Sequence, residues 1–419
     1  MGAKNVTIRF KTGHFTTGVF ALALLGSTAL GSMTAQAADQ EISWIYCGDK
    51  IDPIHEKYIK EWEGKNAGWK IAPEVVGWEQ CQDKATTLAA AGTPVGMAYV
   101  GSRTLKEFAQ NDLIIPVPMT EDEKKSYYPN IVDTVTFEDN QWGVPIAFST
   151  KALYWNKDLF KAAGLDPETP PKTWAEEIAF AKQIKEKTGT AGYGLPAKTF
   201  DNTMHQFMHW VYTNNGKVID GDKIVIDSPE VLAALKAYKD ITPYSVEGAT
   251  AYEQNEIRAI FLDGKVGMIQ AGSGAAARLK DTKINWGVAA LPLGTSAKGE
   301  GTLLITDSLA IFKGTGVEEK AAEFAKYITS TDIQHEYELQ GGAGLTPLRP
   351  GAVVDEFVAK EPYWKPFIDG IAYGGPEPLF TDYKGFQNTM IEMVQSVVTG
   401  KAEPADALKK AAADLEQYK

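Results

Sequence analysis

His205 and His209 are four residues apart, so they would share one face of a helix. Two zinc ligands often use this spacing. The residue after His205 is Gln206, however, where the hydrolytic zinc motif has glutamate, and no third ligand is apparent. The pair therefore predicts a packed or pocket-lining helix, and we expect no metal site.

The chain contains acids of the kind that glycosidases use, but it lacks the common catalytic motifs. There is no G-x-S-x-G elbow, no Walker loop and no H-E-x-x-H sequence. A glycosidase needs two carboxyl groups roughly 5 to 10 Å apart, a separation that sequence does not give. We therefore expect no catalytic residue and no enzyme, with a secreted glycoside hydrolase as an alternative. The acids concerned are Asp49, Asp52, Glu79, Asp201 and Asp307.

A carbohydrate site needs a different set of side chains, which the chain supplies in its loops. Sugars present hydroxyl groups and an apolar C–H face, so acids, amides, arginines and aromatic rings suit them. The chain has 10 Trp, 17 Tyr and 17 Phe. Ligand-binding candidates that follow predicted strands are Asp49, Trp78, Glu79, Arg103, Gly272 and Ser273.

Strands and helices alternate through the first part of the chain. Such alternation predicts parallel strands joined by crossover helices in an α/β fold. Ligands bind at the carboxyl ends of the strands in such sheets, so the loops after the strands should line a site. The predicted strands are 42–46, 70–76 and 97–100, the helices are 55–66 and 80–91, and the loops are 47–52, 77–79 and 101–103.

The stretch 143–184 contains a clear helix start. Thr173 followed by Glu176 is a capping box, in which each side chain accepts a hydrogen bond from the other residue's backbone N–H. Pro170 and Pro171 disfavour helix before Lys172. The helix should therefore begin just after Thr173.

Within that stretch, LYWNKDLFKAAGLDPETPPKTW resembles the signature of bacterial extracellular solute-binding proteins of ABC importers, in particular the sugar-binding group of the maltose-binding-protein type. Members read roughly LYYNKDLF, AGLDP and PPKTWDE, so Trp155 replaces a tyrosine and Ala175 an acid. FLDGKVGMIQAGSG resembles the family's FxxGKxAMxxxG element, and GGAGLTPLRPG its Pro-x-Arg element. Members usually have an aromatic residue after the second element, where this chain has Ser273.

The resemblance implies a two-lobed periplasmic-binding-protein fold of the α/β class. Each lobe would be an open, mostly parallel sheet flanked by helices, with the ligand cleft between the lobes. In the family, the chain crosses between lobes near 143–154 and returns through the strand at 302–313. The implied domains are a signal peptide over 1–37, a first lobe over 38–150 and 306–350, and a second lobe over 151–305 and 351–419.

The resemblance also implies a function. The protein would capture a carbohydrate, polyol or sugar derivative by lobe closure and deliver it to ABC transporter permease subunits, as a monomer without a cofactor. The alternative is a binding protein for a polyamine, amino acid or metal. The family register adds the ligand-binding candidates Phe148, Asp201, Asn202, His205, Asp307, Arg349 and Tyr383.

The first 37 residues resemble a secretory signal. A basic start precedes an apolar run over 15–30, and Ala35-Gln36-Ala37 gives a small-residue cleavage site. No lipid-attachment cysteine lies at that site, which favours the periplasm over a tethered lipoprotein. The formal net charge of −12 makes nucleic acid and anionic lipid poor partners.

The chain has two cysteines, Cys47 and Cys81, each just beyond a predicted strand. An isolated pair in an oxidising compartment predicts a disulfide. Closing a loop of about 35 residues would stabilise the fold by about 4 kcal/mol in the chain-entropy model.

Overall fold

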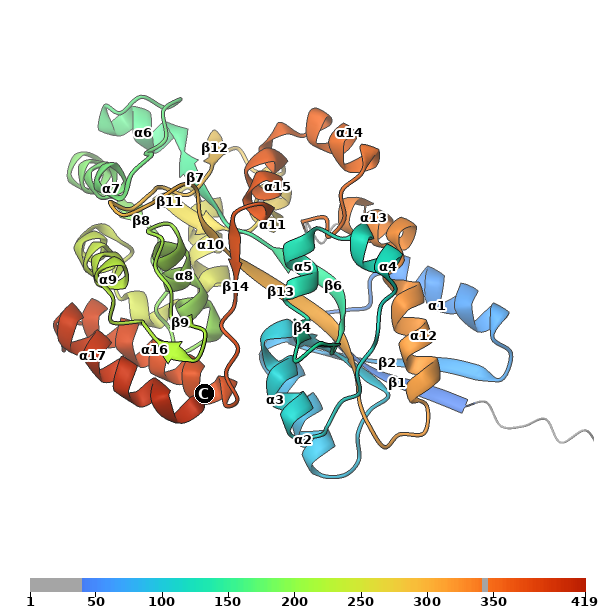
Figure 1. The fold of residues 1–419 in the computed structure, drawn as a ribbon. Coiled ribbons are helices and arrows are strands. Elements are labelled where there is room, and N and C mark those ends of the chain that lie inside the picture. The colour runs from blue at the N-terminus through green and yellow to red at the C-terminus, as the bar shows by residue number, and fades with distance from the viewer. Residues whose placement is uncertain (1–39, 341–345) are drawn as a thin grey trace, which may run out of the picture. The chain divides into compact units, whose positions relative to one another are not determined.

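The computed structural model describes residues 40–340 and 346–419, apart from the side chains of Glu79 and Gln340. The predicted signal peptide lies outside the described residues. The described chain forms a larger sheet of six strands and a smaller sheet of four strands, each flanked by helices (Figure 1). Two short two-stranded ribbons complete its β structure. In this part of the chain, no helix combines the length and the apolar character that crossing a membrane requires.

The larger sheet has the strand order β14-β13-β3-β1-β2, with β6 also paired to β13. β1 runs parallel to β2 and to β3, as the alternation predicted. β13 runs antiparallel to β3 and β6 and parallel to β14. The strands are β1 (Gln40–Cys47), β2 (Trp69–Val76), β3 (Met97–Gly101), β6 (Val144–Ser149), β13 (Thr302–Ile311) and β14 (Gly374–Pro376).

Helices α1 (Pro53–Lys65) and α2 (Trp78–Ala90) connect the first three strands. The chain moves from β1 to β2 and then back past β1 to β3, so right-handed crossovers carry the two helices to opposite faces of the sheet (Figure 1). α1 begins where the carboxylate of Asp52 accepts from the N–H of Ile54 at 2.9 Å. Both helices follow carboxyl ends of strands, where ligand loops were predicted.

The smaller sheet has the order β12-β7-β11-β8 and corrects one prediction. It is not mostly parallel, because β7 runs antiparallel to both β11 and β12 and only β11 and β8 are parallel. β7 follows β6 across two residues, Thr150 and Lys151, so it enters this sheet directly and without a crossover helix. The strands are β7 (Ala152–Asn156), β8 (Ala191–Tyr193), β11 (Val266–Ala271) and β12 (Trp286–Ala289).

The helix start predicted at Thr173 is confirmed in α7 (Trp174–Thr188). The Thr173 hydroxyl accepts from the Glu176 N–H, and the Glu176 carboxylate accepts from the Thr173 N–H, both at 3.2 Å. At the other end, Gly189 adopts φ 72°, a left-handed conformation that favours glycine. Local capping chemistry therefore agrees with both ends of this helix, and at its start the N–H of Trp174 also donates to the distant carbonyl oxygen of Leu293 at 3.0 Å.

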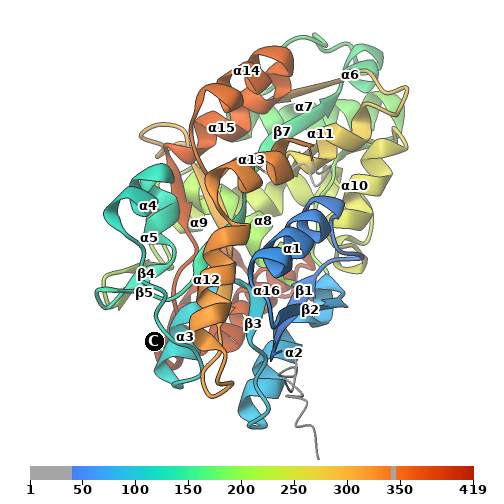
Figure 2. The same cartoon turned by 90° about the vertical axis from the view of Figure 1, so that its right-hand side faces the viewer.

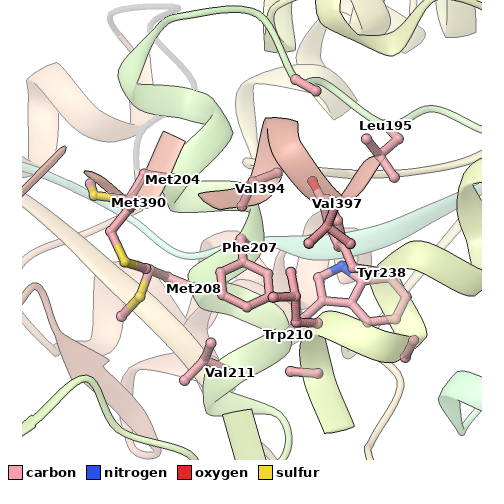
Figure 3. Packing of buried hydrophobic residues seen from close by; sticks show 14 of the residues in the cluster. Leu195, Met204, Phe207, Met208, Trp210, Val211, Tyr238, Met390, Val394 and Val397 are labelled. Atoms are coloured by element: carbon pink, nitrogen blue, oxygen red, sulfur yellow. The ribbon is translucent and has the colours of Figure 1, made fainter. Parts of the chain in front are cut away.

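Helices α8 (Asp201–Tyr212) and α16 (Tyr383–Val398) share an apolar core beside the smaller sheet (Figure 3). Tyr238 meets Trp210 edge to face, with ring centroids 5.6 Å apart. His209 is packed, as predicted, and its Nδ1 accepts from the N–H of Leu303 at 3.1 Å. This packing fixes α8 against β13. Core residues labelled in Figure 3 include Met204, Phe207, Met208, Met390, Val394 and Val397.

The remaining helices lie around the two sheets and around helices α8 and α16 (Figures 1 and 2). They are α3 (Leu105–Gln110), α4 (Glu121–Ser126), α5 (Pro129–Asp133), α6 (Lys157–Ala163), α9 (Pro229–Ile241), α10 (Gln254–Leu262), α11 (Gly274–Leu279), α12 (Glu318–Ile328), α13 (Thr331–Gln340), α14 (Ala352–Lys360), α15 (Lys365–Ile371) and α17 (Pro404–Leu415). The ribbons pair β4 (Thr136–Phe137) with β5 (Asn140–Gln141) and β9 (Ile219–Asp220) with β10 (Lys223–Ile224).

β14 lies on the edge of the larger sheet, although 351–419 was assigned from sequence to the second lobe. The two glycines of β14 allow it to lie close to β13 and α8. A side chain on Gly374 would collide with Leu304, and one on Gly375 with Tyr212. The chain then continues into α16, so the segment after β14 links the two sheets.

The predicted disulfide between Cys47 and Cys81 is confirmed, with the two Cα atoms 5.6 Å apart. It ties the end of β1 to the first turn of α2. Both cysteines are buried, and the sulfur of Cys47 lies 3.3 Å from the carbonyl oxygen of Tyr99 on β3. The disulfide thus joins the elements at the carboxyl edge of the larger sheet.

Candidate functional site

Arg103 lies at the carboxyl end of β3, in a short 3₁₀ helix over Ser102–Thr104. β3 pairs with β13 there, and the register places Gly101 opposite Asp307. Arg103 therefore lies beside Asp307, with Nη1 3.8 Å from Oδ1. A side chain at Gly101 would displace the guanidinium, so this approach depends on glycine.

Two further acids complete the surroundings of Arg103. Glu377, just after β14, places Oε2 3.2 Å from Nη1. Asp201, the first residue of α8, places Oδ2 3.4 Å from Nη2. The arginine side chain is only 10% exposed. Three carboxylates from segments far apart in the sequence thus surround one guanidinium, and we call this set, with His205 and Tyr383, the Arg103 cluster.

His205 and Tyr383 join the cluster through Glu377. His205 lies four residues after Asp201 on α8, so both side chains share one face of the helix. Its Nε2 shares a hydrogen bond of 2.5 Å with Glu377 Oε1. The Tyr383 hydroxyl, at the start of α16, donates to the same oxygen at 3.1 Å. Arg103 also lies 5.6 Å from the centre of the Tyr383 ring, within cation–π range.

Two aromatic residues extend the cluster along the larger sheet. The hydroxyl of Tyr99, on β3, donates to Asp307 Oδ2 at 2.9 Å. Trp78, the first residue of α2, meets the Tyr99 ring edge to face with centroids 5.3 Å apart. The Trp78 side chain is 57% exposed and so offers a ring face to solvent. An exposed ring beside carboxylates is an arrangement that suits a sugar.

The electrostatics of the cluster follow from burial and charge together. Burial opposes the charge of Arg103, but its acidic neighbours, Glu377 foremost, outweigh this and raise its pKa above the ordinary value. Burial raises the pKa of Asp307 to about 6, against the opposing effects of Arg103 and Tyr99. Burial also acts on Glu377, yet Arg103 and His205 together lower its pKa. The cluster therefore holds ionised acids in a buried setting.

A cavity of about 70 Å³ adjoins Arg103 and Glu377. Thr306 lines it, and the buried Thr306 hydroxyl makes no hydrogen bond within the described residues. The cluster around this cavity combines carboxylates, a guanidinium, an imidazole and phenols, which are groups that bond hydroxyl groups well. Within residues 40–340 and 346–419, no group of three His, Cys, Asp or Glu side chains is arranged to hold a metal ion.

Arg349, predicted from the Pro-x-Arg element, lies in different surroundings. Its guanidinium stacks 3.7 Å from the centre of the Tyr127 ring, and its Nε donates to the Ser126 hydroxyl at 3.1 Å. Burial lowers its pKa, although Tyr127 and Glu338 favour the charge. Among the described residues, no hydrogen bond or ion pair joins it to the Arg103 cluster. Its role in ligand binding stays a prediction.

Three predicted residues lie near the link between the sheets. Phe148 is buried in an apolar cluster at the end of β6. Gly272 follows β11, and its carbonyl oxygen accepts from the Tyr154 hydroxyl at 3.0 Å. Ser273 is buried at the start of α11. Within the described residues, neither Phe148 nor Gly272 makes a hydrogen bond to the Arg103 cluster, and the predicted roles of all three residues stay open.

The other predicted residues are more peripheral. Asp49 is exposed in the turn after β1. Asn202 is half-buried in the first turn of α8, next to Asp201. Glu79 belongs to α2, but its side chain lies outside the described part of the structure. The structure therefore brings Trp78, Arg103, Asp201, His205, Asp307 and Tyr383 into one connected set.

Sequence reasoning missed Glu377, Tyr99 and Lys151. Glu377 lies between two prolines outside any predicted element, and the sequence Gly374-Gly375-Pro376 before it was its only signal. Tyr99 lies inside a strand that reads as core. Lys151, in the link between β6 and β7, is half-buried, and burial with Arg258 lowers its pKa to about 8. The signal that could have found Lys151 was its position in the predicted crossover between the lobes.

Comparison with known proteins gives concordant matches. Residues 57–366 match the family model described as bacterial extracellular solute-binding protein. A Brucella abortus protein named only as a binding protein is 29% identical over 94% of this chain and 96% of its own length. The sn-glycerol-3-phosphate-binding periplasmic protein UgpB of Brucella suis is 26% identical over 83% of this chain and 84% of its own.

Solved structures agree with the architecture. An ABC transporter solute-binding protein of Thermotoga lettingae, bound to α-D-tagatose, has a TM-score of 0.79 at 26% identity, covering 90% of this chain and 99% of that one. Maltose-bound MalE3 of T. maritima has a TM-score of 0.78 at 24% identity, with the same coverage. These structures share the fold of two sheets connected by several chain segments.

Proposed function

Because the chain belongs to the bacterial extracellular solute-binding proteins, we propose that it captures a carbohydrate between two lobes and delivers it to the membrane permease of an ABC importer. The fold is the two-lobed α/β fold of that family. Its relatives are binding proteins and not enzymes. We further propose that the protein acts as a monomer in the periplasm, after removal of residues 1–37.

The Arg103 cluster is the observation that supports this proposal. Arg103 follows a strand of the larger sheet, whereas Asp201 and His205 lie on α8, which packs against the smaller sheet and against the first residues of β13. A ligand bound here would touch elements of both sheets and favour the conformation that brings them together. Proteins similar to this chain are named for maltose, tagatose and sn-glycerol-3-phosphate, which are polyhydroxylated ligands.

We propose lobes with the boundaries predicted from sequence, 38–150 and 306–350 for the first and 151–305 and 351–419 for the second. Two parts of the second, 302–305 of β13 and the strand β14, pair within the larger sheet and so depart from these boundaries. The link at Thr150 and Lys151 and the segment after β14 would act as hinges, since each passes between the sheets. Phe148 and Arg349 stay proposed ligand-binding residues, on the family register alone.

Thermal-shift screening of the purified protein tests the function. The panel contains mono- and oligosaccharides, polyols, amino acids, polyamines and Zn²⁺. We expect a rise in melting temperature with at least one sugar or polyol, because a ligand at 100 times its Kd adds about 2.7 kcal/mol to stability. Replacing Glu377 by alanine should abolish this rise while the protein stays folded. A response to amino acids, polyamines or Zn²⁺ alone would contradict the proposal.

A further inference from the structure

The charges around Arg103 bear on which ligands the proposed site accepts. Both outer nitrogens of the guanidinium already face acids, with Glu377 at 3.2 Å and Asp201 at 3.4 Å. Asp307 lies 3.8 Å away on the same side as Glu377. The remaining nitrogen, Nε, is buried. An anionic group on a ligand would therefore have to displace a carboxylate from Arg103, and that carboxylate would lose its cation.

Two basic side chains near the Arg103 cluster, Lys151 and Arg258, also have acids beside them. Lys151 is half-buried near Asp201 and Glu253, and both acids favour its charge. Arg258 is half-buried and also faces Glu253, while Arg278, which is exposed, opposes its charge. The two half-buried bases, Lys151 and Arg258, thus each lie near an acid.

These groups carry no excess of positive charge. The acids Asp201, Glu253, Asp307 and Glu377 outnumber the bases Arg103, Lys151 and Arg258 by one, and they equal the bases in number when His205, bonded to Glu377, is protonated. His209, which also lies near Lys151, has its pKa lowered by burial and is neutral. A buried site with this balance penalises a further negative charge, because a desolvated anion beside carboxylates has no free counter-ion.

We propose that the site takes a polyhydroxylated ligand that is uncharged or carries an amino group, and that it rejects sugar phosphates and uronic acids. The inference rests on the proposed function, since it specifies the charge of the carbohydrate. Neutral hydroxyl groups donate to the carboxylates of the Arg103 cluster without adding charge. An ammonium group pairs with a carboxylate of the cluster, whereas a phosphate or carboxylate group on the ligand adds a negative charge that has no free base to pair with.

Titration calorimetry with matched ligand sets tests the proposal. Each set shares one skeleton: glucose, glucosamine, glucuronate and glucose 6-phosphate, the corresponding galactose and mannose sets, and glycerol with sn-glycerol 3-phosphate. In every set that binds, the neutral or amino member should bind at least ten-fold more tightly than its anionic partner. Equal or tighter binding of the anion overturns the inference but leaves the function standing. If no carbohydrate binds, in the sets or in the thermal-shift panel, the function itself fails and the inference with it.

Replacing Asp201 by asparagine tests whether charge is the cause. D201N frees one face of Arg103 and removes one acid, so the preference against the anionic partner should shrink at least ten-fold. D220N is the matched control. Asp220 is an exposed acid paired with Lys217, and its replacement by asparagine changes the net charge by the same amount as D201N. D307N is a second variant with the same expectation, in case D201N does not fold. An unchanged preference in the folded cluster variants would refute the charge argument.

Discussion

Glu177 shows how strongly burial acts on single residues in this fold. It lies on α7, is fully buried, and its carboxylate oxygens make no hydrogen bond within the described residues. Burial raises its pKa from 4.5 to about 8, and the nearby Gln270 opposes this only in part. The folded state thus holds the proton more tightly than the unfolded state. Its contribution to stability is fully present below pH 4.5 and is lost as the pH rises through 8.

Replacing Glu177 by glutamine should remove this pH dependence, because glutamine has nearly the same shape and does not ionise. At pH 9 the variant should be more stable than the parent by on the order of 4 kcal/mol, with little difference at pH 5. Urea unfolding at pH 5, 7 and 9 measures this. E186Q, an exposed change on the same helix, is the control and should follow the parent. Parallel profiles for E177Q and the parent would contradict the assignment.

At the residue scale, sequence could predict the candidates but not their partners. Arg103 and Asp307 were both candidates because each lies at a strand end or crossover. Their contact depends on the register of β3 against β13, which joins residues about two hundred positions apart and which local patterns do not determine. Glu377 was missed for the same reason, because only tertiary packing makes it part of the site.

At the scale of elements, local signals predicted helix ends well and strand directions less well. The capping box at Thr173 and the crossover helices α1 and α2 appeared as expected, since caps and periodicity are properties of short segments. The antiparallel direction of β7 was not expected. A strand carries the same alternating pattern in either direction, so its pairing depends on where the chain enters the sheet.

The disulfide is the strongest single restraint on an element at the candidate site. It holds the start of α2, which carries Trp78, against β1 and β3. Reduction should lower the free energy of unfolding by about 3 to 4 kcal/mol, because it releases a long loop in the unfolded chain. Urea unfolding with and without dithiothreitol measures this.

The C47A/C81A variant serves as the control for that measurement. It should unfold at the lower urea concentration and should not respond to dithiothreitol, because the chain has no other cysteine. A parent protein whose unfolding midpoint is the same under both conditions would show that the disulfide does not stabilise the fold.

At the scale of the whole molecule, the proposed mechanism predicts a change in size. Only a few segments link the two sheets, so the lobes should move relative to one another when a ligand binds. Small-angle scattering with the sugar found by thermal shift should give a smaller radius of gyration than without it. A sugar that gives no thermal shift is the control. An unchanged radius with bound ligand would count against hinge closure.

The position of β13 has a consequence for how the chain folds. β13 lies between β14 and β3 in the larger sheet and also pairs with β6, yet it begins only at Thr302. The hydrogen bond between Ser102 and Ser308, for example, spans 206 residues of sequence. Contacts over such separations are slow to form because the intervening chain must first lose its freedom. β13, the partner of β3 and β6, is therefore absent until about three quarters of the chain has been synthesised, and β14 at the edge of the sheet follows later. The folding of β1, β2 and β3 should therefore wait for β13, which is the last of their neighbouring strands to be synthesised.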